Sequence, residues 1–201
     1  MTVHIFSSAR LPATPWKNGG GTTQEVVCHP AGADLSSFAW RVSIAQITSN
    51  GPFSAFPGID RVITLLHGDG VQLLAQDGSV NHRLDQSLAP FAFSGDVALD
   101  CTLLGGPSHD FNVMTRRGAV QAKVHIANAQ AVQVPSISGV LLARAGSWQI
   151  TGLPGQEGCS LSAGAQDGMF WINAVTGVVA TPVSADAQLI VVAIEETSSR
   201  T

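Results

Sequence analysis

A glycine-rich run beside a lysine is the first feature of this sequence that could bind an anion. Residues 15–24 read Pro-Trp-Lys-Asn-Gly-Gly-Gly-Thr-Thr-Gln, and Lys17 is one of only two lysines in the chain. Glycine allows the backbone to adopt positive φ, and successive N–H groups in such a turn can point together at an anion. Trp16 supplies a rigid wall, and Asn18 supplies a neutral hydrogen-bonding amide. The run therefore predicts a small polar binding site, with a flexible surface loop as the alternative.

Two arginine-containing segments could supply further positive charge to such a site. Turn-forming Pro and Gly residues occur in the segment 50–61, where Asp60 directly precedes Arg61. This pairing suggests a guanidinium held at a strand end. Further along, Asn112 and Arg116 are spaced to share one face of a strand, so an amide could join an arginine in a pocket. The alternative for each arginine is a surface ion pair.

The elements that must position these residues are β-strands. Short apolar segments recur along the chain and are separated by Gly-Asp, Asp-Gly and Pro-containing breaks, which is typical of an all-β protein. The segment 38–45 alternates large apolar residues with small ones and Arg41, and 61–66 is apolar on both faces, as expected of a buried strand. In 120–126 the alternation places Lys123 and His125 on a solvated face. Hairpin turns are expected at 68–70, 77–78 and 167–168.

Composition narrows the class of protein. The chain has 201 residues, of which 45% are hydrophobic and 12% charged, and its formal net charge is -4. This charge argues against a nucleic-acid partner, which requires a basic face. No apolar run approaches the roughly 20 residues that span a bilayer, and no secretory signal begins the sequence, so we expect a cytoplasmic protein without a membrane partner. The three cysteines are widely spaced and are expected to be reduced.

Several separate motifs, in order along the first 118 residues, resemble the HutD/Ves family. The resemblance rests on residues 15–23, 40–45, 51–61, 90–96 and 110–118. It implies a bicupin, meaning two antiparallel β-barrel or jelly-roll halves in one chain. The approximate halves are 1–127 and 128–201, and strand exchange between them is left open. The HutD branch implies an association with histidine degradation, and the Ves branch a stress-linked role.

Cupin enzymes usually hold a metal through a His-x-His pair together with a Glu and a distant His, because these ligands suit iron, manganese and similar ions. This sequence has no such pair, and its six histidines are dispersed. It also lacks the Gly-x-Ser-x-Gly elbow, the phosphate-binding loop and the dinucleotide-binding glycine pattern. We therefore expect neither a metal nor another cofactor.

The leading hypothesis is a metal-free protein that binds a small carboxylate, such as formylglutamate or urocanate, and senses or tunes histidine degradation. The partner is thus a small anionic metabolite, and a homodimer is left open. The alternatives are a metal-free hydrolase or isomerase using Asp60 or His109 as a general base, and a stress-linked scaffold of the Ves type. The expected ligand-binding residues are Trp16, Lys17, Asn18, Gly19, Gly20, Arg41, Asp60, Arg61 and Asn112. No catalytic residue is assigned.

Overall fold

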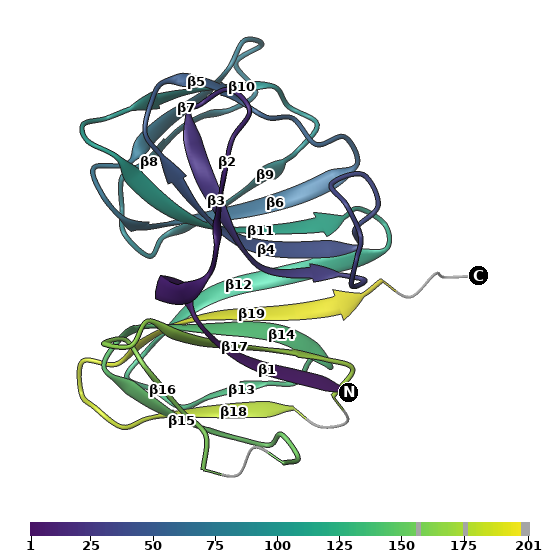
Figure 1. Ribbon diagram of the computed structural model, residues 1–201, viewed down its shortest axis with the longest axis vertical. Coiled ribbons are helices and arrows are strands. Elements are labelled where there is room, and N and C mark those ends of the chain that lie inside the picture. Colours follow the sequence, from purple (N-terminus) through teal and green to yellow (C-terminus); the bar gives the residue numbers. More distant parts are fainter. Residues whose placement is uncertain (156–157, 175–176, 198–201) are drawn as a thin grey trace. The chain divides into compact units, whose positions relative to one another are not determined.

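The computed structural model describes residues 1–155, 158–174 and 177–197, and these ranges are almost entirely β-structure (Figure 1). They form strands β1 to β19 and one short 3-10 helix, η1 (Ser8–Arg10). The all-β class predicted from the alternating apolar segments is confirmed. The described part of the chain contains no helix of the length and apolarity that a bilayer crossing requires.

Contacts divide the chain into two compact units. The N-barrel comprises Pro12–Gln121, and the C-barrel comprises Met1–Leu11 together with Ala122–Thr197. The sequence suggested halves meeting near residue 127. The division by contacts lies within β12 (Val120–Asn128), and the first strand of the chain belongs to the C-barrel.

The N-barrel consists of a six-stranded sheet, in the order β2-β3-β4-β11-β6-β9, and a four-stranded sheet, in the order β5-β10-β7-β8. All neighbouring strands in these two sheets are antiparallel. The strands are β2 (Ala13–Pro15), β3 (Gly21–His29), β4 (Trp40–Ile47), β5 (Gly51–Phe53), β6 (Ile59–His67), β7 (Val71–Ala75), β8 (Asn81–Leu84), β9 (Pro90–Ser94), β10 (Leu99–Leu103) and β11 (Ser108–Arg116).

The C-barrel has a five-stranded sheet, in the order β1-β17-β14-β19-β12, and a four-stranded sheet, in the order β13-β18-β15-β16. Strand β17 pairs in antiparallel fashion with both β1 and β14. The remaining bounds are β1 (Thr2–Ser7), β13 (Val132–Val134), β14 (Ser138–Ala145), β15 (Ser147–Thr151), β16 (Ser160–Ser162), β17 (Asp167–Ile172), β18 (Val178–Pro182) and β19 (Gln188–Glu196).

Most of the strand and turn predictions are confirmed. Strand β6 is buried along both faces, while Lys123 and His125 are exposed on β12. The turns at 68–70 and 77–78 contain glycines with positive φ. The turn expected at Asp167-Gly168 was wrong, because these residues begin β17. Strand pairing brings Phe6 of β1 opposite Gly168, and the Phe6 ring occupies the space that a side chain there would fill.

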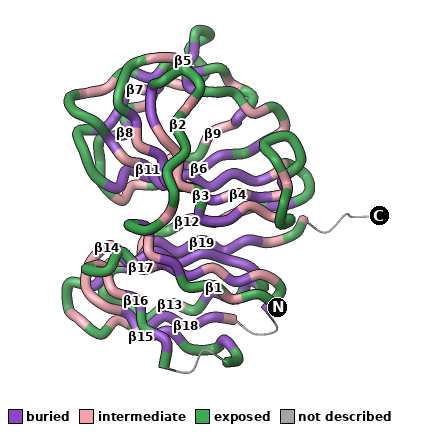
Figure 2. The backbone as a smooth tube through the Cα atoms, in the orientation of Figure 1, coloured by how far each residue is buried: buried purple, intermediate pink, exposed green. Residues whose placement is uncertain are grey.

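The interiors of the two barrels differ in polarity. The C-barrel core is built from apolar side chains, including the fully buried Trp148 and Trp171. The N-barrel also has an apolar cluster, in which Ile63 and Leu65 of β6 pack with residues of the four-stranded sheet. The two charged side chains classed as buried among the described residues, Arg61 and Asp110, both belong to the N-barrel. Figure 2 shows that β4, β6 and β11, the central strands of the six-stranded sheet, are buried for most of their length.

Candidate functional site

Polar side chains gather on the inner face of the six-stranded sheet, on three neighbouring strands. Met114 of β11 lies directly opposite Arg41 of β4 on one side and Arg61 of β6 on the other. Asn112 and Asp110 follow on the same face of β11, because alternate strand residues point to the same side. Asp110 lies opposite Leu65, which packs in the N-barrel core, so this face is the interior of the barrel.

Arg61 is a buried cation enclosed by aromatic rings. Arg61 is only 4% exposed. Its guanidinium carbon lies 4.5 Å from the ring centroid of Phe53, 5.1 Å from that of Phe93 and 5.4 Å from that of Phe56. Its Nη1 donates a hydrogen bond to the carbonyl oxygen of Ser54 at 3.2 Å. Burial lowers the pKa of Arg61 to about 10, with Asp110 acting in the opposite direction, so the group remains charged at neutral pH.

Asp110 and Asn112 bring buried oxygen atoms to the same face. Asp110 is 2% exposed and Asn112 is 6% exposed. Both carboxylate oxygens of Asp110 and the Oδ1 of Asn112 have no hydrogen-bond partner within the described chain. Burial raises the pKa of the Asp110 carboxyl to about 7, because a desolvated carboxylate is unfavourable, and the charge of Arg61 opposes this rise only in part.

Arg41 already has an acidic partner. Its Nε donates to Oε2 of Glu25 at 2.8 Å, with Arg41 largely covered and Glu25 half-exposed. Glu25 lies on β3 opposite Ser43, beside a bulge between Glu25 and Val27. A bidentate guanidinium can hold a second acceptor beside its ion pair, so Arg41 can still contribute to anion binding.

The glycine-rich run forms the turn between β2 and β3, and its backbone donors are used inside the turn. The N–H of Gly19 donates to the carbonyl of Trp16 at 3.0 Å, and the N–H of Gly20 donates to Oδ1 of Asn18 at 3.0 Å. The prediction that these two N–H groups point at a ligand was therefore wrong. The glycines are required by the backbone conformation. Gly19 has φ +71°, and a Cβ at position 21 would overlap the carbonyl of Gln46.

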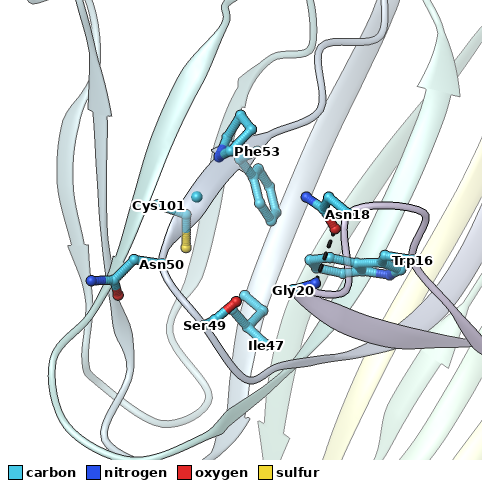
Figure 3. Close-up of a pocket in the computed structure, with 10 residues that line it drawn as sticks. Trp16, Asn18, Gly20, Ile47, Ser49, Asn50, Phe53 and Cys101 are labelled. Atoms are coloured by element: carbon cyan, nitrogen blue, oxygen red, sulfur yellow. Dashed lines mark hydrogen bonds between the residues drawn. The ribbon is translucent and has the colours of Figure 1, made fainter.

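A small pocket opens beside this turn (Figure 3). Figure 3 shows Trp16 and Asn18 on one side of it, with Cys101 and Asn50 on the other. The lining residues are Trp16, Asn18, Gly20, Ile47, Ser49, Asn50, Gly51, Pro52, Phe53 and Cys101. The cavity measures about 10 Å³, which is room for about one water molecule.

The pocket adjoins the buried charges through two of its lining residues. Phe53 lines the pocket and also stacks on the Arg61 guanidinium. Burial raises the pKa of the Cys101 thiol to about 12, and the charge of Asp110 contributes to this rise. Trp16 is held at the pocket by a hydrogen bond from its Nε1 to Oγ1 of Thr23 at 2.7 Å. The predicted residues Trp16, Asn18 and Gly20 thus line a pocket whose Phe53 ring also contacts the Arg61 guanidinium.

Three residues considered for the site lie elsewhere. Lys17 is exposed and has no ion pair or hydrogen bond of its side chain to any described residue. Asp60 is exposed on the outer face of β6, where it pairs with Arg117 at 2.7 Å. His109 lies on the outer face of β11, with its ring centroid 4.0 Å from that of His67. Neither proposed base therefore faces Arg61, because successive strand residues point to opposite sides.

Sequence reasoning missed the most deeply buried acid of this site. Asp110 lies two residues before Asn112, so the same strand periodicity that selected Asn112 also places Asp110 on its face. Arg116, which had been paired with Asn112, instead donates to the carbonyl oxygens of Phe38 and Ser36, both at 2.9 Å. Glu25 and the aromatic rings around Arg61 could not be selected from spacing, because they come from separate strands and, for Phe56, from the segment between β5 and β6.

The donor set of the N-barrel does not fit a metal of the usual cupin kind. Its buried polar face presents guanidinium, amide and a single carboxyl group, whereas such a metal needs several imidazoles and a carboxylate together. Within the described ranges, no three His, Cys, Asp or Glu side chains gather in a metal-binding arrangement.

Comparisons with known proteins agree with the motifs. The HutD family profile matches residues 8–190. Protein Ves from Escherichia fergusonii is 42% identical over 149 residues, which cover 74% of this chain and 76% of that protein. An uncharacterized 21.2 kDa protein in the hutC 3' region of Pseudomonas putida is 40% identical over 155 residues, which cover 77% of this chain and 80% of that protein.

Solved structures share the whole fold. HutD from Pseudomonas fluorescens SBW25, described for a formate condition, has a TM-score of 0.81 at 27% identity and covers 98% of this chain and 100% of its own. Oxalate decarboxylase from Lactobacillus farciminis has a TM-score of 0.64 at 8% identity, and the match covers 96% of this chain and 88% of that protein. At this identity the similarity concerns the fold alone. The predicted bicupin fold is confirmed.

Proposed function

Because the chain belongs to the HutD/Ves family, we propose that it is a cytoplasmic, metal-free protein that binds a small carboxylate metabolite of histidine degradation and senses its level. The ligand is an acid of the size of formylglutamate or urocanate. It binds on the inner face of the N-barrel, with its carboxylate at Arg61 and with Arg41 and Asn112 as further contacts. The regulated partner is not assigned.

The burial of Arg61 is the observation that carries this proposal. Within the described chain Arg61 forms no ion pair, and its Nε has no hydrogen-bond partner. Removing a cation from water without a counter-ion costs several kcal/mol in the folded state. A bound carboxylate would offset that cost through two parallel hydrogen bonds, which a guanidinium can make and a lysine cannot.

The pocket in Figure 3 gives the ligand a route to Arg61. At about 10 Å³ it is too small for a metabolite, so binding requires a side chain to move. Phe53 borders both the pocket and the guanidinium. Turning this ring outward would join the two, with Trp16 and Asn18 remaining as the outer wall.

Binding at Arg61 also supplies a way to report the bound ligand. Arg61 donates to the carbonyl of Ser54, which follows β5 directly. A ligand carboxylate would compete for this guanidinium and release the segment 54–58 between β5 and β6. Binding would therefore change an exposed segment of the N-barrel, and a partner protein could recognise that change.

Isothermal titration calorimetry with N-formyl-L-glutamate, urocanate and formate tests the proposal. Arg61→Gln should lower the affinity for the best of these acids at least ten-fold, because it removes the charge and the bidentate geometry. Arg83→Gln is the matched control, since Arg83 is exposed on β8 and paired with Asp85. If none of the three acids binds the unaltered protein, the proposal fails.

A second candidate function is a metal-free enzyme in which Asp110 is the general base. Its pKa of about 7 and its unpartnered oxygens are those of a group able to exchange a proton near neutral pH. Incubation of the protein with formylglutamate or urocanate, with NMR to detect any product, distinguishes the enzyme from the sensor. Turnover that Asp110→Asn abolishes would favour the enzyme over the sensor.

A further inference from the structure

The two buried charges of the N-barrel face the same interior without touching. Arg61 is opposite Met114, and Asp110 lies on the same face of β11 as Met114. Each charge affects the pKa of the other. No nitrogen of Arg61 is within the 4.0 Å ion-pair distance of an Asp110 oxygen in the described structure. Two opposite buried charges therefore face one interior without pairing with each other.

Polar atoms of these two groups and of Asn112 lack hydrogen-bond partners. The Nε–H of Arg61 is an unused donor, and both oxygens of Asp110 are unused acceptors, with Oδ1 of Asn112 as a third. All three residues are more than nine-tenths buried. Buried polar atoms are nearly always hydrogen-bonded, so such a group indicates a missing partner. The missing partner must offer an acceptor to Arg61 and, above the Asp110 pKa of about 7, a donor to the ionised carboxylate.

We infer that Asp110 selects ligands that carry an N–H or O–H donor beside their carboxylate. This inference rests on the proposed function and makes its ligand class narrower. The acid group of the ligand meets Arg61, and the donor on the adjacent carbon meets Asp110. N-acylated amino acids and hydroxy acids have this arrangement.

A simple dicarboxylate lacks the donor that Asp110 requires. Its second carboxylate would approach Asp110 as a like charge and would leave the buried Asp110 oxygens without a hydrogen bond. Both effects reduce affinity, since an unsatisfied buried acceptor and a like-charge contact are unfavourable. Glutarate should therefore bind more weakly than an N-acylated amino acid of equal length.

A matched ligand pair tests this inference. N-formyl-L-glutamate has an N–H, and its ester isostere, (2S)-2-formyloxyglutarate, replaces that N–H with oxygen at nearly constant shape. Calorimetry at pH 8.5, with glutarate as a third acid, should give the amide at least a ten-fold advantage over the ester. This factor is typical of one hydrogen bond to a charged group.

Variants of Asp110 assign the preference to this side chain. Asp110→Leu should bring the amide-to-ester ratio close to one, and Asp110→Asn, which keeps a neutral acceptor, should give an intermediate ratio. Asp100→Asn is the control, because Asp100 is exposed on β10. Circular dichroism and thermal unfolding confirm that each variant folds, and the two Asp110 variants provide independent measurements.

The outcomes separate the two proposals. Equal binding of amide and ester by the unaltered protein overturns the inference and leaves the proposed function intact. A bound water, and not the ligand, would then be the hydrogen-bond partner of Asp110. A preference that persists in both Asp110 variants also overturns it. If none of the three acids binds, the proposed function and the inference fail together.

Discussion

Asp60 and Arg61 are neighbours in the sequence and lie on opposite faces of β6. Arg61 points into the N-barrel, where three aromatic rings surround it. Asp60 points outward and pairs with Arg117, which also pairs with Asp96. Only Arg61 can therefore contact a ligand inside the barrel, although the two residues appeared in the sequence as one candidate ion pair.

This arrangement predicts opposite effects of substituting the two neighbours. Asp60→Asn should leave the affinity for N-formyl-L-glutamate within two-fold of the unaltered protein, whereas Arg61→Gln should lower it at least ten-fold. Calorimetry at one pH and salt concentration measures both. A large loss of affinity in Asp60→Asn would place the binding site on the outer face instead.

Asp110 should make the stability of the protein depend on pH. Its pKa is about 7 in the folded state, above the ordinary value near 3.9 in the unfolded chain. The folded state therefore binds a proton more tightly, and this contribution to stability is complete below about pH 4 and is lost as the pH rises through 7. The loss is roughly 1.4 kcal/mol per pKa unit, or a few kcal/mol in total.

Urea unfolding between pH 4 and pH 8 measures this effect as a difference between proteins. The free energy of unfolding of Asp110→Asn, relative to the unaltered protein, should rise across this range, because an amide does not ionise. The exposed Asp100→Asn control should show a constant difference. A constant difference for Asp110→Asn as well would mean that the carboxyl group titrates at its ordinary pKa.

The start of β3 should be intolerant of a side chain at Gly21. A Cβ at this position would overlap the carbonyl of Gln46 on the paired strand β4. Gly21→Ala should therefore lower the free energy of unfolding by about 1–3 kcal/mol. Gly51→Ala is the control, since no atom lies within 4 Å of its Cβ position, and it should change stability by less than about 0.5 kcal/mol. Equal effects would contradict the close approach.

Ligand binding should release the segment that follows β5. If a carboxylate replaces the carbonyl of Ser54 at Arg61, the amides of Phe56 and Gly58, which donate hydrogen bonds to Gly95 and Asp96, should exchange hydrogen faster when N-formyl-L-glutamate is bound. Hydrogen exchange followed by mass spectrometry measures this, with β13 of the C-barrel as an internal reference. Slower exchange across 54–58 would mean that the ligand closes the segment instead of releasing it.

Trp16 should report binding by fluorescence. It is partly exposed and lines the pocket, whereas Trp40, Trp148 and Trp171 are at most 2% exposed. The emission should change on addition of N-formyl-L-glutamate, and Trp16→Phe should remove most of that change. An undiminished response in this variant would indicate that the ligand binds away from the pocket.

The sequence by itself determined the secondary structure and the family. Alternation of apolar and small residues predicts strands, because side chains alternate between faces, and turn glycines mark positions where positive φ is required. These are local properties of the chain. The same alternation correctly placed Lys123 and His125 on a solvated face. Motifs in order along the chain were enough to identify the HutD/Ves resemblance and, through it, the bicupin fold.

Only the tertiary structure decided which candidate residues meet. Strand register brings Arg41, Arg61, Asn112 and Asp110 to one inner face, and register depends on pairing between strands that are distant in the sequence. The same pairing turns Asp60 outward. The N–H groups of Gly19 and Gly20 form hydrogen bonds inside the glycine-rich turn, and Lys17 remains exposed. Charge and spacing in the sequence identify candidates, but burial determines which of them lack a partner and so require a ligand.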